Sequence, residues 1–303
     1  MFKIALLGTG GTMPLPNRAL TAMIGSCNGK MILIDCGEGT QVQLKKIGWG
    51  LKNIDIICFT HYHPDHIVGL PGLLSTIGNS ERTEPMTIIG PKGLHEIIKG
   101  LMVIVPYLPY KLNLIEIPEE GLNSFCHGRY CISSIYVDHS VTCAAYSIGV
   151  KRNRIFDPQK AVKNNIPVEF WNKLQKGNTV NLEGKTITPD MVLGDERKGL
   201  KVCYCTDSRP TLGLVDFVQD SDLFICEGMY GDNDNLEKAL KNKHMLFSEA
   251  AHIAKEGKVK ELWLTHFSPA LNNPEEYIDV AKEIFDNTVV GKELMKKELK
   301  FSK

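Results

Sequence analysis

The chain lacks an excess of charge of either sign. Its 303 residues include 35 Lys and Arg and 35 Asp and Glu, so the formal net charge at pH 7 is zero. Because no global field would draw such a protein to nucleic acid or to a membrane surface, any RNA contact has to come from a local basic patch. Hydrophobic residues make up 43% and charged residues 23% of the sequence, which is typical of a globular protein with a substantial core.

Long apolar runs and paired metal-binding cysteines are also missing. No stretch approaches the length needed to span a membrane, and the apolar residues 1–7 are too few for a signal peptide. The nine cysteines are odd in number, irregularly spaced and include no Cys-x-x-Cys pair. This pattern argues for reduced thiols and against a disulfide framework. We therefore expect a cytoplasmic protein without a membrane partner.

Histidine is scarce, with nine in the chain, yet three of them fall within six positions. His61, His63 and His66, with Asp65 among them, follow the β-branched run 54–59, which predicts a buried strand that turns into a helix. In extended chain His61 and His63 point to the same side, whereas Asp65 and His66 come after the turn. Imidazole and carboxylate without thiolate are typical of a catalytic metal site. A histidine-rich surface loop is the less favoured alternative.

The same arrangement, a short strand that ends at an acid or a histidine, recurs along the chain. It is found at Asp35, His139, Asp207, Glu227 and His266. Strands that alternate with helices predict a layered α/β fold, in which sites gather at the carboxyl ends of the strands. Taken alone, a histidine such as His139 would more often be structural. Beside the upstream cluster it becomes a candidate ligand.

The composition changes between about residue 150 and residue 193. The stretch opens with a basic cluster formed by Lys151, Arg152 and Arg154. Its apolar content is low, and residues 177–187 are patterned like a hairpin, so we expect an insertion that lies outside the core. An exposed Trp171 could stack on a base. Outside this stretch, Arg18 follows a proline-rich loop and is a candidate for a phosphate contact, or else a solvated arginine.

These motifs together resemble a known family. The pattern His61-x-His63-x-Asp65-His66 is similar to the signature of the metallo-β-lactamase superfamily. The flanking sequences resemble those of ribonuclease Z, the tRNA 3′-processing endonucleases, at residues 7–11, 34–41, 69–74 and 264–269. The resemblance implies one domain over residues 1–303, folded as an αβ/βα four-layer sandwich. It also implies a protruding arm at residues 150–193, which would serve as an RNA-binding exosite.

The resemblance implies two metal ions, zinc by preference and manganese as an alternative. One ion would be held by His61, His63 and His139, the other by Asp65, His66 and His266, and Asp207 would bridge them. Two such cations can share a hydroxide that attacks phosphorus, so Asp65 also counts as catalytic. His244 would protonate the departing ribose 3′-oxygen, with Glu227 orienting it, while Asp35 shapes the loop by hydrogen bonding.

The leading function is therefore removal of the 3′ trailer from precursor tRNA by a homodimer. The rival within the same fold is hydrolysis of small phosphodiesters or cyclic nucleotides. Two departures from the family pattern favour the rival. Pro167 is followed by Val168-Glu169-Phe170-Trp171 and not by a Gly-Pro-rich segment, and Ala270 stands where relatives often have Arg. An RNA-binding protein with a decayed site is disfavoured, because the ligand set is complete.

Overall fold

The computed structural model describes residues 1–182 and 184–302. The chain divides into two compact units. The first, which we call the main unit, contains residues 1–150 and 200–300. The second, which we call the small unit, contains residues 151–199 with the last residues of the chain. It includes residues 151–193 of the expected arm and extends to Gly199.

One seven-stranded sheet of the main unit comes mostly from the N-terminal half of the chain. Its strands, in spatial order, are β16 (Lys296–Leu299), β1 (Phe2–Gly8), β2 (Ala22–Cys27), β3 (Lys30–Ile34), β4 (Ile54–Cys58), β5 (Met86–Gly90) and β6 (Leu112–Glu116). From β3 to β6 the strands are parallel. The helices that follow them are α1 (Thr40–Ile47), α2 (Pro64–Ile67), α3 (Leu70–Gly78) and α4 (Leu94–Leu101), and 3₁₀ helix η1 (Met102–Ile104) continues α4.

The second seven-stranded sheet comes from the C-terminal half. In spatial order it contains β15 (Thr288–Val290), β14 (Leu262–Thr265), β13 (Leu223–Glu227), β12 (Arg197–Cys205), β9 (Cys143–Arg152), β8 (Tyr130–Val137) and β7 (Leu122–His127). Strands β12 to β15 are parallel. The accompanying helices are α7 (Leu212–Val218), α8 (Leu236–Asn242), α9 (Phe247–Glu256) and α10 (Ile278–Lys282), with 3₁₀ helices η3 (Asn233–Asn235) and η4 (Pro274–Tyr277).

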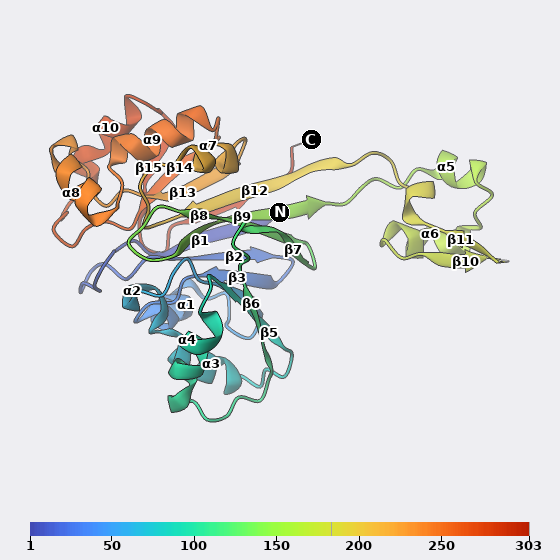
Figure 1. The fold of residues 1–303 in the computed structure, drawn as a ribbon. Coiled ribbons are helices and arrows are strands. Elements are labelled where there is room, and N and C mark those ends of the chain that lie inside the picture. The colour runs from blue at the N-terminus through green and yellow to red at the C-terminus, as the bar shows by residue number, and fades with distance from the viewer. Residues whose placement is uncertain (183, 303) are drawn as a thin grey trace. The chain divides into compact units, whose positions relative to one another are not determined.

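The two sheets face each other, and the helices cover their outer faces (Figure 1). Strands β4 and β5 are buried at every position, as expected for parallel strands covered on both faces. Contacts between the sheets include the hydrogen bond from the Tyr130 hydroxyl to the Lys30 carbonyl, at 2.7 Å, and the edge-to-face packing of Tyr130 on Phe2. The predicted αβ/βα four-layer sandwich is confirmed.

The small unit has a core of its own. It contains α5 (Pro158–Lys163), α6 (Val168–Gln175), η2 (Pro189–Met191) and a hairpin of β10 (Val180–Leu182) and β11 (Lys185–Ile187). Its buried apolar residues are Ala161, Ile166, Leu174, Ile187, Val192 and Leu193. The expectation of an exposed Trp171 is wrong, because its ring packs on Phe156 and its Nε1 donates to the Ile166 carbonyl at 2.9 Å. The low apolar content concealed this small core.

The cysteines depart from expectation at one place. Cys126 on β7 and Cys131 on β8 are direct partners in the antiparallel ladder and form a disulfide. The other seven cysteines are free and buried. The expectation of reduced thiols throughout is therefore wrong for this pair, which the spacing alone did not reveal because the hairpin register brings the two residues together.

Within the described ranges of the chain, no helix is both long enough and apolar enough to cross a membrane.

Candidate metal centre

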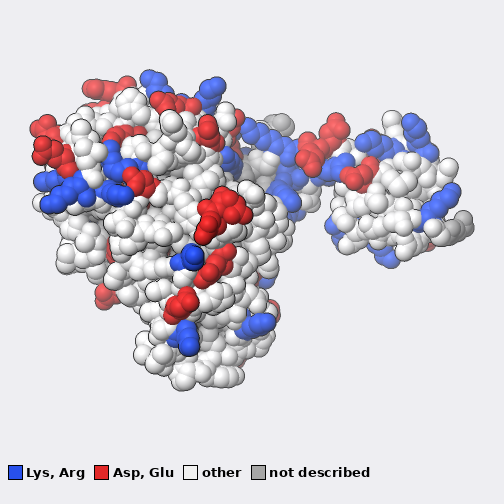
Figure 2. All heavy atoms as spheres, viewed as in Figure 1, with Lys and Arg blue, Asp and Glu red and all other residues white. Residues whose placement is uncertain are grey.

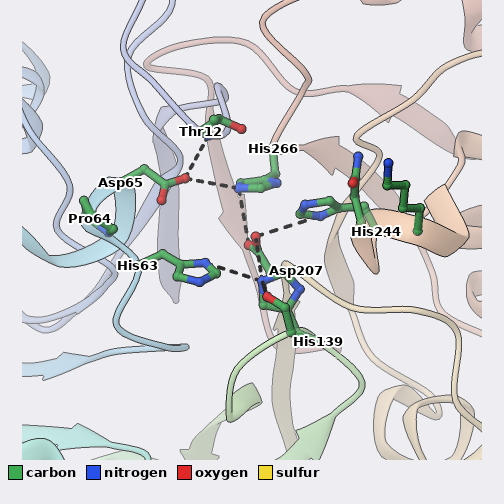
Figure 3. A pocket seen from close by; sticks show the side chains of 11 residues that line it. Thr12, His63, Pro64, Asp65, His139, Asp207, His244 and His266 are labelled. Atoms are coloured by element: carbon green, nitrogen blue, oxygen red, sulfur yellow. Dashed lines mark hydrogen bonds and ion pairs between the residues drawn. The ribbon is translucent and has the colours of Figure 1, made fainter. Parts of the chain in front are cut away.

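The side chains predicted to bind metal meet at one edge of the main unit. They follow the carboxyl ends of strands from both sheets: β4 leads to His61, His63, Asp65 and His66, β8 to His139, β12 to Asp207 and β14 to His266. Figure 3 shows that those it labels converge on a common centre between the two sheets. Sequence segments more than 200 residues apart thus supply one cluster, as parallel strand ends in layered α/β folds allow.

Three residues after the strands have a left-handed backbone conformation that non-glycine residues rarely adopt. Asp35 has φ of 61°, Asp207 of 56° and His266 of 57°. Such conformations cost of order 1–3 kcal/mol each and persist where the surrounding structure over-determines them, which happens most often at functional sites. Here each one turns a polar side chain back toward the edge where the strands end.

Two glycines make room for the cluster. A Cβ atom at Gly11 would lie 2.8 Å from Cε1 of His266, and one at Gly37 would lie 1.9 Å from the Asp65 carbonyl oxygen. Neither position accepts a side chain without moving a candidate ligand. The Gly-rich turn after β1, at Gly11, and the turn after β3, at Gly37, therefore let the backbone approach the site closely.

His61, His63 and His139 form the first group of possible ligands. Nδ1 of His63 lies 2.9 Å from Nε2 of His61 and 3.4 Å from Nε2 of His139. The remaining nitrogens of two of these rings are engaged elsewhere. Nδ1 of His61 lies 3.1 Å from the Thr60 hydroxyl, and Nδ1 of His139 lies 3.2 Å from the Lys243 carbonyl oxygen. Partners of this kind fix the ring orientation and direct the other nitrogen toward the centre.

Asp65, His66 and His266 form the second group. Oδ2 of Asp65 lies 3.3 Å from Nε2 of His66 and 3.7 Å from Nε2 of His266. The backbone N–H of Thr12 donates to the same oxygen at 2.8 Å. Asp35 is fully buried, accepts from the Thr60 N–H at 2.9 Å and lies 2.9 Å from Nδ1 of His66. It therefore holds His66 from outside the cluster.

Asp207 lies between the two groups and directs one oxygen to each. Its Oδ1 lies 4.0 Å from Nε2 of His61 and 3.9 Å from Nε2 of His139. Its Oδ2 lies 3.3 Å from Nε2 of both His66 and His266. A carboxylate in this position can bind a cation on either side, as the bridging role implies.

The electrostatics favour the protonation states that metal ligands require at His61, Asp65 and Asp207, whereas Asp207 and Asp35 raise the pKa of His66 against the effect of burial. Burial and, to a smaller extent, the neighbouring His66 lower the pKa of His61 to about 2, so the His61 ring is neutral. Burial alone would raise the pKa of Asp65, but the neighbouring His266 and His66 rings hold it well below its usual value. The pKa of Asp207 is likewise held low by His266 and His66 against the effect of burial. Metal binding needs neutral imidazole and ionised carboxylate.

Unsatisfied buried atoms also fit a cation. Among the described residues, Nε2 of His66, Nε2 of His266 and Oδ2 of Asp207 are buried and have no hydrogen-bond partner. Burying such atoms unpaired is costly, and native proteins rarely leave them so. All three point to the same centre, and nitrogen and oxygen donors without thiolate suit divalent zinc or manganese. The residues present therefore fit a divalent metal site.

A cavity of about 480 Å³ opens over the cluster. It is lined by Thr12, His63, Pro64, Asp65, His139, Ser140, Asp207, Lys241, Asn242, His244 and His266 (Figure 3). This volume falls within the range of ordinary small-molecule and cofactor sites. It leaves room for a phosphodiester and adjoining groups.

His244 lies at this cavity and is bound by Glu227. Its side chain is 13% exposed, and its Nδ1 lies 3.0 Å from Oε2 of Glu227, which is fully buried at the end of β13. Oε1 of Glu227 accepts the backbone N–H of Ser208. Burial alone would lower the pKa of His244, but Glu227 raises it to about 9. The ring is therefore protonated at neutral pH while it faces the cavity.

None of the substrate-binding residues predicted from sequence is among the residues that line this cavity. Arg18 donates to the carbonyl oxygens of Ser268 and Asn272, at 3.2 and 3.0 Å, and its guanidinium lies over the Phe267 ring. It therefore joins two loops and is not among the cavity residues. In the small unit, Arg152 donates to the Ser302 carbonyl oxygen at 2.6 Å.

The other two basic residues of the predicted cluster also lie in the small unit. Arg154 pairs with Asp190 and contacts backbone carbonyls of the small core, whereas Lys151 is exposed. We expected all three basic residues of this cluster to be free for RNA, and Lys151 is the one whose surroundings fit that role best.

Sequence reasoning missed a basic group beside the cavity. Lys241 and Asn242, at the end of α8, line the cavity wall. Lys238 lies on the same helix and Lys243 follows it, and Figure 2 shows Lys and Arg gathered over this part of the surface. The signal was present as three lysines within residues 238–243, but it was overlooked because the chain as a whole carries no net charge.

Comparison with known proteins agrees with this geometry. The chain is 57% identical to a ribonuclease Z from Clostridium kluyveri, with 99% of each chain covered, and 53% identical to a ribonuclease Z from Clostridium acetobutylicum, again with 99% of each covered. The crystal structure of human tRNase Z, short form, has a TM-score of 0.71 at 24% identity and covers 99% of this chain and 100% of that one, which shows the fold. A family model described as Anti-Pycsar protein Apyc1 matches residues 2–101. The chain belongs to the ribonuclease Z family of metal-dependent endoribonucleases.

Proposed function

We propose that this protein hydrolyses precursor tRNA at the phosphodiester that joins the tRNA body to its 3′ trailer. The observation that carries the proposal is the position of Asp207, with one oxygen toward each of two three-residue donor groups, in a cavity that His244 also lines. A site with two cations and a separate proton donor suits hydrolysis of a diester whose leaving group is poor. The two ribonuclease Z relatives support the same assignment.

We propose His61, His63 and His139 as the ligands of one ion, with Asp65, His66 and His266 as ligands of the other and Asp207 bridging. Zinc is the proposed ion, and manganese is the alternative that the same donors accept. When bound, two such cations activate a water molecule for attack and neutralise charge on the phosphodiester. Asp65 contributes to catalysis because Thr12 fixes the oxygen that would bind the second ion.

The leaving oxygen needs a proton, and His244 is the proposed donor. As the bond between phosphorus and the ribose 3′-oxygen breaks, His244 gives the proton at its Nε2 to that oxygen. Glu227 holds the opposite nitrogen, Nδ1, at 3.0 Å and stabilises the charged ring before the transfer. The trailer then departs with a 5′-phosphate, and the tRNA keeps a 3′-hydroxyl.

We propose that RNA is bound by Lys151 in the small unit and by the lysines of α8 in the main unit. Both sites present exposed or partly exposed cations, which bind phosphates electrostatically. We also propose a cytoplasmic homodimer. The apolar patch after α4 supports self-association, since Val103, Ile104 and Tyr107 are 77%, 76% and 77% exposed. Such patches commonly mark protein interfaces.

An assay with three substrates tests the proposal. Purified protein would be given a precursor tRNA with a short trailer, bis(p-nitrophenyl) phosphate as a small aryl diester, and a cyclic nucleotide. We expect cleavage at the junction between the tRNA body and its trailer, with kcat/KM well above that for either small substrate, and close to two metal ions per chain by elemental analysis. Preference for a small diester would transfer the assignment to the rival function. An active protein that carries no metal would contradict both.

A further inference from the structure

An ion pair beside the cavity holds the main chain at His244. The side chains of Arg209 and Glu249 are 13% and 19% exposed. One guanidinium nitrogen of Arg209, Nη1, donates both to the His244 carbonyl oxygen and to Oε2 of Glu249, the latter at 2.8 Å. The other nitrogen, Nη2, donates to Oε1 of Glu249. The pair is therefore bidentate, which is the strongest and most directional form of an arginine–carboxylate contact.

The segment that carries His244 lies between two helices, and the backbone N–H of His244 donates to the Ala239 carbonyl oxygen of α8 at 3.0 Å. It lies between α8, whose C-cap residue Lys243 has φ of 56°, and α9, which begins at Phe247. Glu249 accepts the backbone N–H of Leu246 at 2.9 Å and so fixes the start of α9. The same carboxylate binds Arg209, so α9 and the His244 main chain are connected through one ion pair.

Arg209 also reaches the segments that carry candidate metal ligands. It follows Asp207 by two residues, and its backbone N–H donates at 2.9 Å to the carbonyl oxygen of Asp138, the residue before His139. One residue thus joins the three segments that bear Asp207, His139 and His244. Glu227 fixes the His244 ring at Nδ1, and Arg209 fixes its main chain.

We propose that Arg209, acting with Glu249, is a positioning residue that keeps the His244 ring directed at the leaving oxygen. The proposal rests on the proposed function, in which His244 supplies a proton. Lysine cannot replace this arginine, because a single ammonium group cannot bind both carboxylate oxygens and a carbonyl oxygen in one plane. A small misplacement of a proton donor is enough to lower its contribution to the rate.

Arg209→Lys tests the proposal with two substrates that differ in their need for a proton. On precursor tRNA we expect kcat to fall at least tenfold with little change in KM. On bis(p-nitrophenyl) phosphate, whose leaving group departs without protonation, we expect less than a threefold fall. Metal content should stay at the wild-type value. Glu249→Gln should act in the same direction, and the double variant should be no worse than Arg209→Lys, because the two residues act as one unit.

Arg82→Lys is the matched control. Arg82 is 1% exposed and also binds a carboxylate, Asp55 at 3.0 Å, but at the start of β4, the end of that strand remote from the cluster. The control measures what a buried arginine-to-lysine change does through stability alone, and we expect equal effects on the two substrates. Equal losses in Arg209→Lys, loss of metal, or an undiminished rate on precursor tRNA would each overturn the proposal.

A crystal structure of Arg209→Lys gives a readout that does not use activity. We expect the 3.0 Å contact between His244 and Glu227 to be broken or replaced by alternative ring positions. An unchanged contact would overturn the positioning role even if the rate fell. A wild type that hydrolyses the aryl diester but spares precursor tRNA would instead overturn the proposed function, and the crystal structure would still decide the role of Arg209.

Discussion

The metal centre and the small unit differ in how firmly the surrounding structure holds their polar side chains. In the centre, the donors follow strand ends and are buried or half-buried, and partners outside the cluster orient several of them, as Asp35 does for His66 and Thr12 for Asp65. In the small unit, six buried apolar residues hold a compact fold, and the charged side chains lie mostly on its surface. In the metal centre, the geometry of the site therefore restricts which residue can stand at each position. In the small unit, most charged residues lie on the surface and are not restricted in this way.

The sharpest test of the contrast is to remove one donor of the centre. His63→Ala should lose at least one metal ion per chain and lower the rate on both substrates by about a thousandfold or more, because the cations supply several kcal/mol of stabilisation. Elemental analysis and initial rates measure this. His95→Ala, an exposed histidine on α4, is the control and should change neither. Retention of both ions in His63→Ala would remove His63 from the proposed ligands.

The next test separates chemistry at the leaving group from chemistry at the metals. His244→Ala should keep both ions and slow precursor cleavage by roughly 10²–10⁴-fold, the usual contribution of general acid catalysis. Hydrolysis of bis(p-nitrophenyl) phosphate should fall much less. Equal losses on both substrates would indicate disturbed metals or folding, and His244 would then no longer be assigned as the acid.

This difference between regions also explains what the sequence could predict. The strand and helix positions near the site followed from apolar periodicity, since the strand predicted over 54–59 is β4 and the chain then turns into helix α2 at Pro64. The cluster was recognisable because three histidines and an acid share one turn. That these donors would meet His139, Asp207 and His266 required the family resemblance, since periodicity gives strands but not the way two sheets face each other.

Other features depended on contacts that no local pattern encodes. Arg18 and Arg154 look like free cations in the sequence, yet the structure binds one to loop carbonyls and the other to Asp190. The contact between Arg209 and Glu249 spans 40 residues and depends on how α9 packs. A charge by itself does not reveal whether a partner will neutralise it, which explains why predictions were weaker in the small unit.

The third test uses pH to examine the pair that orients the proton donor. His244 must be protonated to act, and Glu227 raises its pKa to about 9. The rate of precursor cleavage should therefore fall as the pH rises above about 9. Glu227→Gln removes the charge that raises the pKa, so the alkaline limb should move to lower pH. Rate–pH profiles on both substrates measure this. If the fall in rate at alkaline pH occurs at the same pH in Glu227→Gln as in the wild type, a group other than His244 controls that fall.

The fourth test removes most of the small unit, residues 153–196, and keeps Lys151. Strands β9 and β12 are neighbours, and the chain leaves the main unit on one and returns on the other, so a short Gly-Ser turn can replace residues 153–196. We expect KM for precursor tRNA to rise at least about tenfold, or 1.4 kcal/mol of binding, with little change for the aryl diester. Removal of 167–177 alone is less suitable, because it would take Leu174 out of the small core. Unchanged kinetics on precursor tRNA would favour the small-diester function.

The smallest expected effect is that of one exposed cation. If Lys151 contacts an RNA phosphate, Lys151→Gln should reduce the slope of log Kd against log salt by about 1, because one fewer counterion is released on binding. Kinetics on the aryl diester should be unchanged. Lys260→Gln is the matched control, since it removes the same charge from a residue paired with Asp222 before β14, at the opposite end of that strand from His266. Equal slopes for the two variants would show that the fall reflects total charge and not a contact at Lys151. A reduced slope for Lys151→Gln alone would establish that the small unit binds RNA through surface charge, in contrast to the fixed geometry of the metal centre.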